Sequence, residues 1–161
     1  MPKEIERKFL VKDGRWRETA GQGVKLIQAY VAVMDDRNVR VRLYEDGRAK
    51  LTMKAGRAGL SRDEVEFAVP AEEARELLDL AIGNRIEKVR YEIPHAGFVW
   101  EIDVYEGALA GLTVAEVELN SEDDQPAIPA WVGRELTGDQ AYSNQSLALY
   151  GLPEIRTHAR A

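Results

Sequence analysis

The sequence predicts a mainly β (α+β) fold, in which an antiparallel barrel or sandwich is flanked by helices. Eight segments alternate apolar and polar residues and are rich in Val, Ile, Tyr and Phe, as strands are: residues 3–12, 24–34, 37–44, 48–55, 61–69, 85–93, 98–106 and 112–120. Short turns join several of them, at residues 45–47, 56–59 and 94–97. Short strands joined mainly by hairpins favour an antiparallel architecture over a parallel α/β sheet.

Two further stretches have the spacing of amphipathic helices. Residues 71–82 follow Pro70 and stop at Gly83, and residues 139–150 end at Gly151. Between the last strand and the second helix, residues 121–138 contain two prolines and two glycines, which predicts an irregular segment on the surface. We expect both helices to cover the sheet.

The length of 161 residues predicts a single domain over residues 1–161, with a core at about 3–150 and a flexible C-terminal tail from residue 156. The absence of cysteine excludes disulfides and thiolate metal sites. No apolar run approaches the roughly 20 residues of a membrane helix, and no secretory signal opens the chain, so we expect a cytoplasmic protein without a membrane partner. A net charge of −6 disfavours a nucleic-acid partner.

The charged residues are sorted onto one face of the predicted sheet. Residues two apart in a strand share a face. On the seven predicted strands other than residues 24–34, 17 of the 18 positions considered on this face are charged, and only Thr52 is neutral. The acidic positions are Glu4, Glu6, Glu64, Glu66, Glu92, Glu101, Asp103, Glu116 and Glu118, and the basic positions are Lys8, Arg40, Arg42, Lys50, Lys54, Arg62, Lys88 and Arg90. The first, seventh and eighth strands are mainly acidic, whereas the third and fourth are basic.

Two interpretations fit this face. It is either the solvent-exposed side of a sheet, with ordinary cross-strand charge pairs, or the lining of a site for a polyphosphate. Solvent-exposed faces usually mix in neutral polar residues, whereas a polyphosphate requires Arg and Lys for its oxygens and carboxylates for the Mg²⁺ or Mn²⁺ that accompanies it. A barrel closed with this face inward would leave apolar residues outside, and any uncovered part predicts self-association as a homodimer.

The segment Glu4-Ile5-Glu6-Arg7-Lys8 matches the E-x-E-x-K signature of the CYTH superfamily, also called triphosphate tunnel metalloenzymes. The ordered charges that follow strengthen the match, and the chain most resembles the short bacterial members known as inorganic triphosphatases. The resemblance covers about residues 3–150. It implies an eight-stranded antiparallel closed tunnel β-barrel with the charged face inward.

The resemblance also implies roles for individual residues. Glu4, Glu6, Glu116 and Glu118, with Asp103 nearby, would hold one or two Mg²⁺ or Mn²⁺ ions, and Lys8, Arg40, Arg42, Lys54, Lys88 and Arg90 would bind phosphates, with Arg62 as an additional clamp. A helix that begins at Asn144 and Ser146 would close one mouth of the tunnel. Gln145 stands where some similar triphosphatases carry Lys, which leaves open whether this helix touches substrate.

The expected reaction is attack of water on the terminal phosphorus of a linear triphosphate, with inorganic tripolyphosphate favoured. Such chemistry needs placement and charge neutralisation more than a nucleophile. We expect Glu116 to act in catalysis, with Lys8 or Lys88 assisting the leaving diphosphate. His95 and His158 are not expected to bind metal, and the three tryptophans are expected to pack in the core.

Three alternatives remain open from the sequence. A class IV adenylyl cyclase or a thiamine triphosphatase would use the same charged tunnel but needs a pocket for an organic group. A non-catalytic module that binds polyphosphate or nucleotide would have no use for the acidic positions unless a cation is bound among them.

Overall fold

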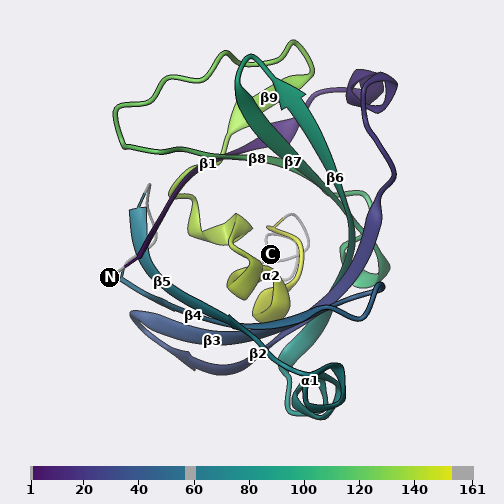
Figure 1. Ribbon diagram of the computed structural model, residues 1–161, viewed down its shortest axis with the longest axis vertical. Coiled ribbons are helices and arrows are strands. Elements are labelled where there is room, and N and C mark those ends of the chain that lie inside the picture. Colours follow the sequence, from purple (N-terminus) through teal and green to yellow (C-terminus); the bar gives the residue numbers. More distant parts are fainter. Residues whose placement is uncertain (1, 57–60, 154–161) are drawn as a thin grey trace, which may run out of the picture.

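A closed antiparallel barrel forms the centre of the protein (Figure 1). The computed structural model describes residues 2–56 and 61–153. In this part of the chain the strands are β1 (Lys3–Val11), β2 (Val24–Met34), β3 (Arg37–Tyr44), β4 (Ala49–Ala55), β5 (Ser61–Ala68), β6 (Ile82–His95), β7 (Phe98–Tyr105), β8 (Thr113–Glu118) and β9 (Val132–Glu135). The sheet runs in the order β5-β4-β3-β2-β6-β7-β8-β1-β9.

The barrel closes where β1 meets β5. Lys3, Glu4 and Ile5 pair with Asp63, Arg62 and Ser61, so β1 to β8 form a ring of eight antiparallel strands. The eight-stranded closed barrel that the family resemblance implied is therefore confirmed. Closure places the charged faces of strands that are distant in the sequence around one interior.

The short strand β9 was not predicted, because residues 121–138 were expected to be irregular throughout. β9 pairs with β1 from Phe9 to Val11, on the part of the β1 edge that β5 does not reach. Four residues are too few to show alternation. The residues before β9 instead cover the outside of the barrel, where Trp131 packs edge-on against Trp100 at 6.0 Å between ring centroids.

Both helices are shorter than predicted. α1 (Ala71–Leu78) ends four residues early, because residues 79–81 turn and β6 already begins at Ile82. α2 (Asn144–Tyr150) begins only after a separate 3₁₀ turn, Gln140–Tyr142. Ser143 provides its cap, since the Ser143 hydroxyl accepts a hydrogen bond from the Ser146 amide. Other 3₁₀ turns lie at Gly14–Glu18 and Gly107–Leu109.

The apolar face of the barrel points outward, and three separate segments of the chain pack on it. One outer cluster, which includes Phe9, Trp100 and Val117, is covered by Trp16 and Trp131. A second lies on β2, β3 and β4 beneath Ala74 and Leu78 of α1. Of the two helices only α1 covers the outer surface, and the segment before β9 and the first 3₁₀ turn supply the remaining cover.

A third apolar cluster lies inside one end of the barrel. Tyr30, Ile86 and Val114 belong to the inward-facing alternation of their strands, and they form one buried cluster with Leu147 and Ala148 of α2. In Figure 1, α2 lies within the ring of strands, whereas α1 lies outside it. The second helix therefore fills one end of the barrel and does not cover its outer surface.

None of the helices in the described ranges is long and apolar enough to cross a membrane.

Candidate active site

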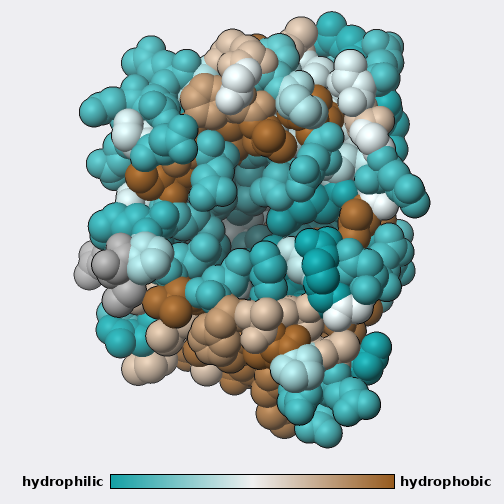
Figure 2. Space-filling view, viewed as in Figure 1, coloured by the Kyte–Doolittle hydropathy of each residue, from teal (hydrophilic) through white to brown (hydrophobic). Residues whose placement is uncertain are grey.

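The interior of the barrel holds a cavity of about 890 Å³. Figure 2 shows it as a hollow surrounded by hydrophilic side chains. Ten of the predicted site residues line it: Glu4, Glu6, Lys8, Arg40, Arg42, Lys54, Arg62, Arg90, Glu116 and Glu118. The other two, Lys88 and Asp103, are buried in the wall and do not reach the cavity surface.

Carboxylates face one another along β1, β7 and β8. Glu6 lies directly opposite Glu118, and Glu116 lies directly opposite Glu101. Burial inside the barrel, together with the charges of Glu116 and Glu4, holds the pKa of Glu6 well above its usual range. Like charges on opposed strands repel, so this row of acids is a site where a cation would relieve repulsion.

The acids are also compatible with the coordination of a hydrated divalent ion. Among the described residues, no group of three or more potential ligands is already assembled around one point. Mg²⁺ often takes only one or two carboxylates, completes its shell with water and substrate phosphate, and needs no cage made wholly of protein. The opposed acids Glu6, Glu116 and Glu118 therefore fit such an ion.

Glu4 and Glu64 share Lys54 at the next part of the wall. The Lys54 ammonium lies 2.8 Å from a Glu4 oxygen and 3.8 Å from a Glu64 oxygen. Burial and the neighbouring Glu4 raise the pKa of Glu64 to about 7. Burial also acts to raise the pKa of Glu4, but Lys54 and the hydrogen bond with Glu64 outweigh it and lower that pKa.

Three arginines face the cavity without an ion pair to a carboxylate in the described part of the chain: Arg40, Arg42 and Arg62. Arg42 instead donates from Nε to Gln28 Oε1 at 2.8 Å, and Arg40 and Arg62 each have a buried Nε with no hydrogen-bond partner. Burial lowers the pKa of Arg42, and the positive charges of Arg40 and Arg90 lower it further. Guanidinium groups that lack a protein counter-ion are suited to an anionic ligand.

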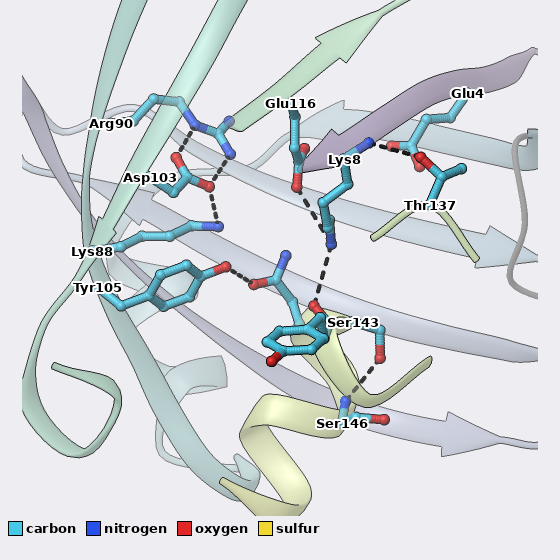
Figure 3. A network of polar contacts seen from close by, with 12 residues as sticks. Glu4, Lys8, Lys88, Arg90, Asp103, Tyr105, Glu116, Thr137, Ser143 and Ser146 are labelled. Atoms are coloured by element: carbon cyan, nitrogen blue, oxygen red, sulfur yellow. Dashed lines mark hydrogen bonds and ion pairs between the residues drawn. The ribbon is translucent and has the colours of Figure 1, made fainter. Parts of the chain in front are cut away.

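Lys8 bridges the acidic row and the C-terminal segment. Its Nζ lies 3.4 Å from Glu116 Oε1 and donates to the Tyr142 carbonyl at 3.4 Å (Figure 3). Burial would lower the pKa of Lys8, but the charges of Glu116 and Glu6 reverse this and raise it. Burial acts to raise the pKa of Glu116, but the positive charges of Lys8, Lys88 and Arg90 outweigh it and lower this pKa to about 2.

A second group of charges lies in the wall between β6 and β7. Arg90 donates to both oxygens of Asp103, at 2.8 and 2.9 Å, and Lys88 Nζ lies 2.7 Å from Asp103 Oδ2 (Figure 3). Burial lowers the pKa of Lys88 to about 7. The charge of Asp103 opposes this shift, whereas the charges of Arg90 and Arg42 add to it. Arg90 also lies 3.3 Å from Glu101.

Sequence reasoning missed several residues of the cavity wall. Gln28 and Tyr30 share the inward face because they pair directly with Arg42 and Arg40. Asn38 donates to Gln145 of α2 at 2.9 Å, so Gln145 binds the barrel wall through its amide. The polar residues Gln28 and Tyr30 could have indicated the inward face of the second strand, but they are uncharged and the prediction was based on charged residues.

The histidines and tryptophans were not expected to belong to the site. His95 is half-buried at the end of β6 and does not line the cavity. Trp16, Trp100 and Trp131 pack in one core cluster. His158, most of the loop at 56–59 and the tail from residue 156 lie outside the described residues.

The fold and the cavity together define a charged-tunnel β-barrel, with cations and carboxylates facing one enclosed space. The chain belongs to the CYTH domain family, whose model matches residues 2–148. It is 42% identical over 148 residues to an inorganic triphosphatase of Acetivibrio thermocellus, covering 91% of this chain and 94% of that one. It is 37% identical over 150 residues to an inorganic triphosphatase of Nitrosomonas europaea, covering 91% and 97%.

A solved structure of an inorganic triphosphatase superposes with a TM-score of 0.64 at 34% identity, covering 90% of this chain and 97% of that one.

Proposed function

We propose that this protein is a metal-dependent triphosphatase that removes the terminal phosphate of a linear triphosphate, with inorganic tripolyphosphate as the favoured substrate. One observation carries the proposal: within one cavity, Arg40, Arg42 and Arg62 lack carboxylate partners in the described chain, while Glu6 and Glu118 oppose each other. The three arginines lack an anion, and the two glutamates lack a cation. A triphosphate with its divalent ion supplies both, and the names of the two relatives support that substrate.

The ion would be Mg²⁺ or Mn²⁺, held by Glu4, Glu6, Glu116 and Glu118. When bound, it supplies charge neutralisation at the phosphate oxygens and polarises the phosphorus. Lys54 lies 2.8 Å from Glu4, closer than Lys8 lies to Glu116 at 3.4 Å, and no ion pair of Glu6 or Glu118 is present in the described chain. We therefore expect Glu6, Glu116 and Glu118 to make the main contribution.

The residues of the chain itself position the reactants. The guanidinium groups of Arg40, Arg42 and Arg62 bind phosphate oxygens and hold the chain of phosphates in one orientation. Glu116 stays ionised at neutral pH because its pKa is about 2, so it orients the attacking water by accepting a hydrogen bond and is a poor base. Attack forms the new bond from water to phosphorus, breaks the bond to the bridging oxygen and releases diphosphate and phosphate, while the proton lost by water passes to a phosphate oxygen or to solvent.

Lys8 is better placed than Lys88 to assist the leaving group. Lys8 lines the cavity and its raised pKa keeps it protonated at neutral pH, so its ammonium can stabilise the oxygen of the departing diphosphate. Lys88 is 0% exposed and lies behind the cavity wall. We therefore assign Lys8 the leaving-group role and expect Lys88 to support the wall.

The test is phosphate release from tripolyphosphate, ATP, thiamine triphosphate and pyrophosphate, each with Mg²⁺, Mn²⁺ or chelator. The expected result is metal-dependent release that is fastest with tripolyphosphate and is lost in Glu6→Gln and Arg40→Ala. Glu72→Gln and Arg75→Ala, exposed changes on α1, are the matched charge controls. Release from none of the four would refute the proposal, and cyclic nucleotide with pyrophosphate from ATP would establish a cyclase instead.

Two further expectations accompany the function. We infer a cytoplasmic location from the substrate and the absence of cysteine. Self-association as a homodimer stays a prediction. It is motivated by the exposed Met53 and Phe67, which are 45% and 52% exposed on the outer face of β4 and β5.

A further inference from the structure

The buried carboxylate of Asp103 is the acid of the charged face that differs most from the others. It is 1% exposed and does not line the cavity. Its neighbour on the same strand face, Glu101, does line the cavity and lies opposite Glu116. The sequence pattern treats the two acids alike, but the structure places one at the surface of the cavity and the other inside its wall.

Both oxygens of Asp103 are already bound by cations. Asp103 Oδ1 accepts from Arg90 Nε at 2.8 Å, and Oδ2 accepts from Arg90 Nη2 at 2.9 Å while lying 2.7 Å from Lys88 Nζ. The cross-strand register explains the arrangement, because Arg90 and Asp103 are direct partners in the β6–β7 pair. A metal ion could reach these oxygens only by displacing two buried cations, whereas at Glu6 it would meet other carboxylates.

The group continues toward α2. Lys88 Nζ lies 5.2 Å from the centroid of the Tyr105 ring, and the Tyr105 hydroxyl donates to Asn144 Oδ1 at 2.6 Å (Figure 3). Arg90 therefore reaches the cavity from a support that extends through Asp103 and Lys88 to the first residue of α2. A guanidinium gripped at Nε and Nη2 has little rotational freedom left.

We propose that Asp103 is a positioning residue, which fixes the guanidinium of Arg90 for phosphate binding and holds Lys88 in the wall, and that it is not a ligand of the metal ion. This inference rests on the proposed triphosphatase function. It removes Asp103 from the ligand set that the family resemblance implies and leaves that set to the acids that line the cavity.

The test compares Asp103→Asn with Glu6→Gln by two measurements. The first is Mn²⁺ binding to the protein without substrate, followed by the electron paramagnetic resonance signal of free Mn²⁺. We expect the affinity to stay within about twofold in Asp103→Asn and to fall by about tenfold or more in Glu6→Gln. An equal loss of Mn²⁺ affinity in both variants would overturn the inference.

The second measurement is the steady-state kinetics of tripolyphosphate hydrolysis in a double-mutant cycle with Arg90→Lys, which removes the planar fork. Asp103→Asn should raise KM by about tenfold in the Arg90 background and by no more than about twofold in the Arg90→Lys background. A KM effect of the same size in both backgrounds would show that Asp103 does not act through Arg90.

Asp103→Glu provides a second route, since it keeps the charge and shifts it by one methylene. If Asp103→Asn fails to fold, Asp103→Glu should still show raised KM with unchanged Mn²⁺ affinity, and a loss of Mn²⁺ affinity would refute the inference. Failure of the proposed function gives a separate result: the wild type would release phosphate from no triphosphate. Tripolyphosphate binding by calorimetry would then replace KM in the same cycle.

Discussion

Replacement of Glu6 by Gln should stabilise the metal-free protein while weakening its response to metal. Glu6 lies opposite Glu118 across β1 and β8, and Glu116 and Glu4 also act on its charge. Directly opposed like charges destabilise a sheet by up to about 1 kcal/mol. The neutral amide has nearly the same shape, so we expect the free energy of unfolding without metal to rise by about 1 kcal/mol.

That change converts to a measurable shift in melting temperature. For a chain of this size, about 1 kcal/mol raises Tm by roughly 2–4 °C. Saturation with Mn²⁺ at about 100 times its Kd should stabilise the wild type by about 2.7 kcal/mol, or roughly 8 °C. At the same Mn²⁺ concentration a tenfold weaker affinity leaves the variant a gain of about 1.4 kcal/mol or less. The wild type should therefore be the less stable protein in chelator and the more stable one in Mn²⁺.

The assay is thermal unfolding followed by circular dichroism at pH 7.5, in chelator and in a Mn²⁺ titration. Glu118→Gln, the opposed partner, should behave similarly, and Glu72→Gln on α1 should change neither curve. A variant that melts below the wild type in chelator would refute the repulsion on which the metal site is inferred. A variant that gains as much from Mn²⁺ as the wild type would show that the ion binds elsewhere.

Three further predictions follow from the same structure. Arg62→Ala should raise KM for tripolyphosphate by about tenfold or more with little loss of stability, because its Nε has no protein partner to lose; steady-state kinetics and thermal melts measure the two effects. Glu64, whose pKa rises from 4.5 when unfolded to about 7 when folded, favours the folded state fully below pH 4.5 and loses that contribution as pH rises to about 7. Glu64→Gln should therefore flatten the fall in denaturant stability across this window, and an unchanged slope would contradict it. Gly83→Ala should destabilise the protein by about 1–3 kcal/mol, because φ is +73° and a Cβ would lie 2.6 Å from the Ala148 carbonyl of α2; hydrogen exchange at residues 144–150 should rise with it, and unchanged protection there would show that the helix is not displaced.

The charged face could be predicted from the sequence because a strand has a side-chain period of two. Alternation alone places Glu4, Glu6 and Lys8 on one side of the first strand, and the structure puts all three at the cavity. The direction of that face could not be derived in the same way. Whether it points in or out depends on the Lys3–Ile5 pairing with β5 and on distant segments that cover the apolar side, and neither leaves a periodic signal.

The sequence also could not predict which residues of the inward face reach the cavity and which are buried in its wall. Glu101 and Asp103 have the same alternation, yet one lines the cavity and the other is enclosed. The difference arises from the partner across the strand pair: Asp103 faces Arg90, whose planar fork covers both oxygens, whereas Glu101 faces Glu92. A register between two strands is a property of the folded sheet, so a single strand does not contain it.

The second helix shows why an inward-facing position need not belong to the site. Ile86 and Val114 follow the same alternation as the charged residues but do not line the cavity, because they lie at one end of the barrel in the apolar cluster that includes Leu147 of α2. The interior is thus divided into an apolar end filled by Leu147 and Ala148 and a charged remainder open to ligand. Because the plug is fixed by apolar packing and by the Asn38–Gln145 and Tyr105–Asn144 hydrogen bonds, its position does not depend on a lysine at 145. The amide of Gln145 is sufficient to hold the helix through Asn38, so we expect the arginines of the barrel wall to bind the phosphates.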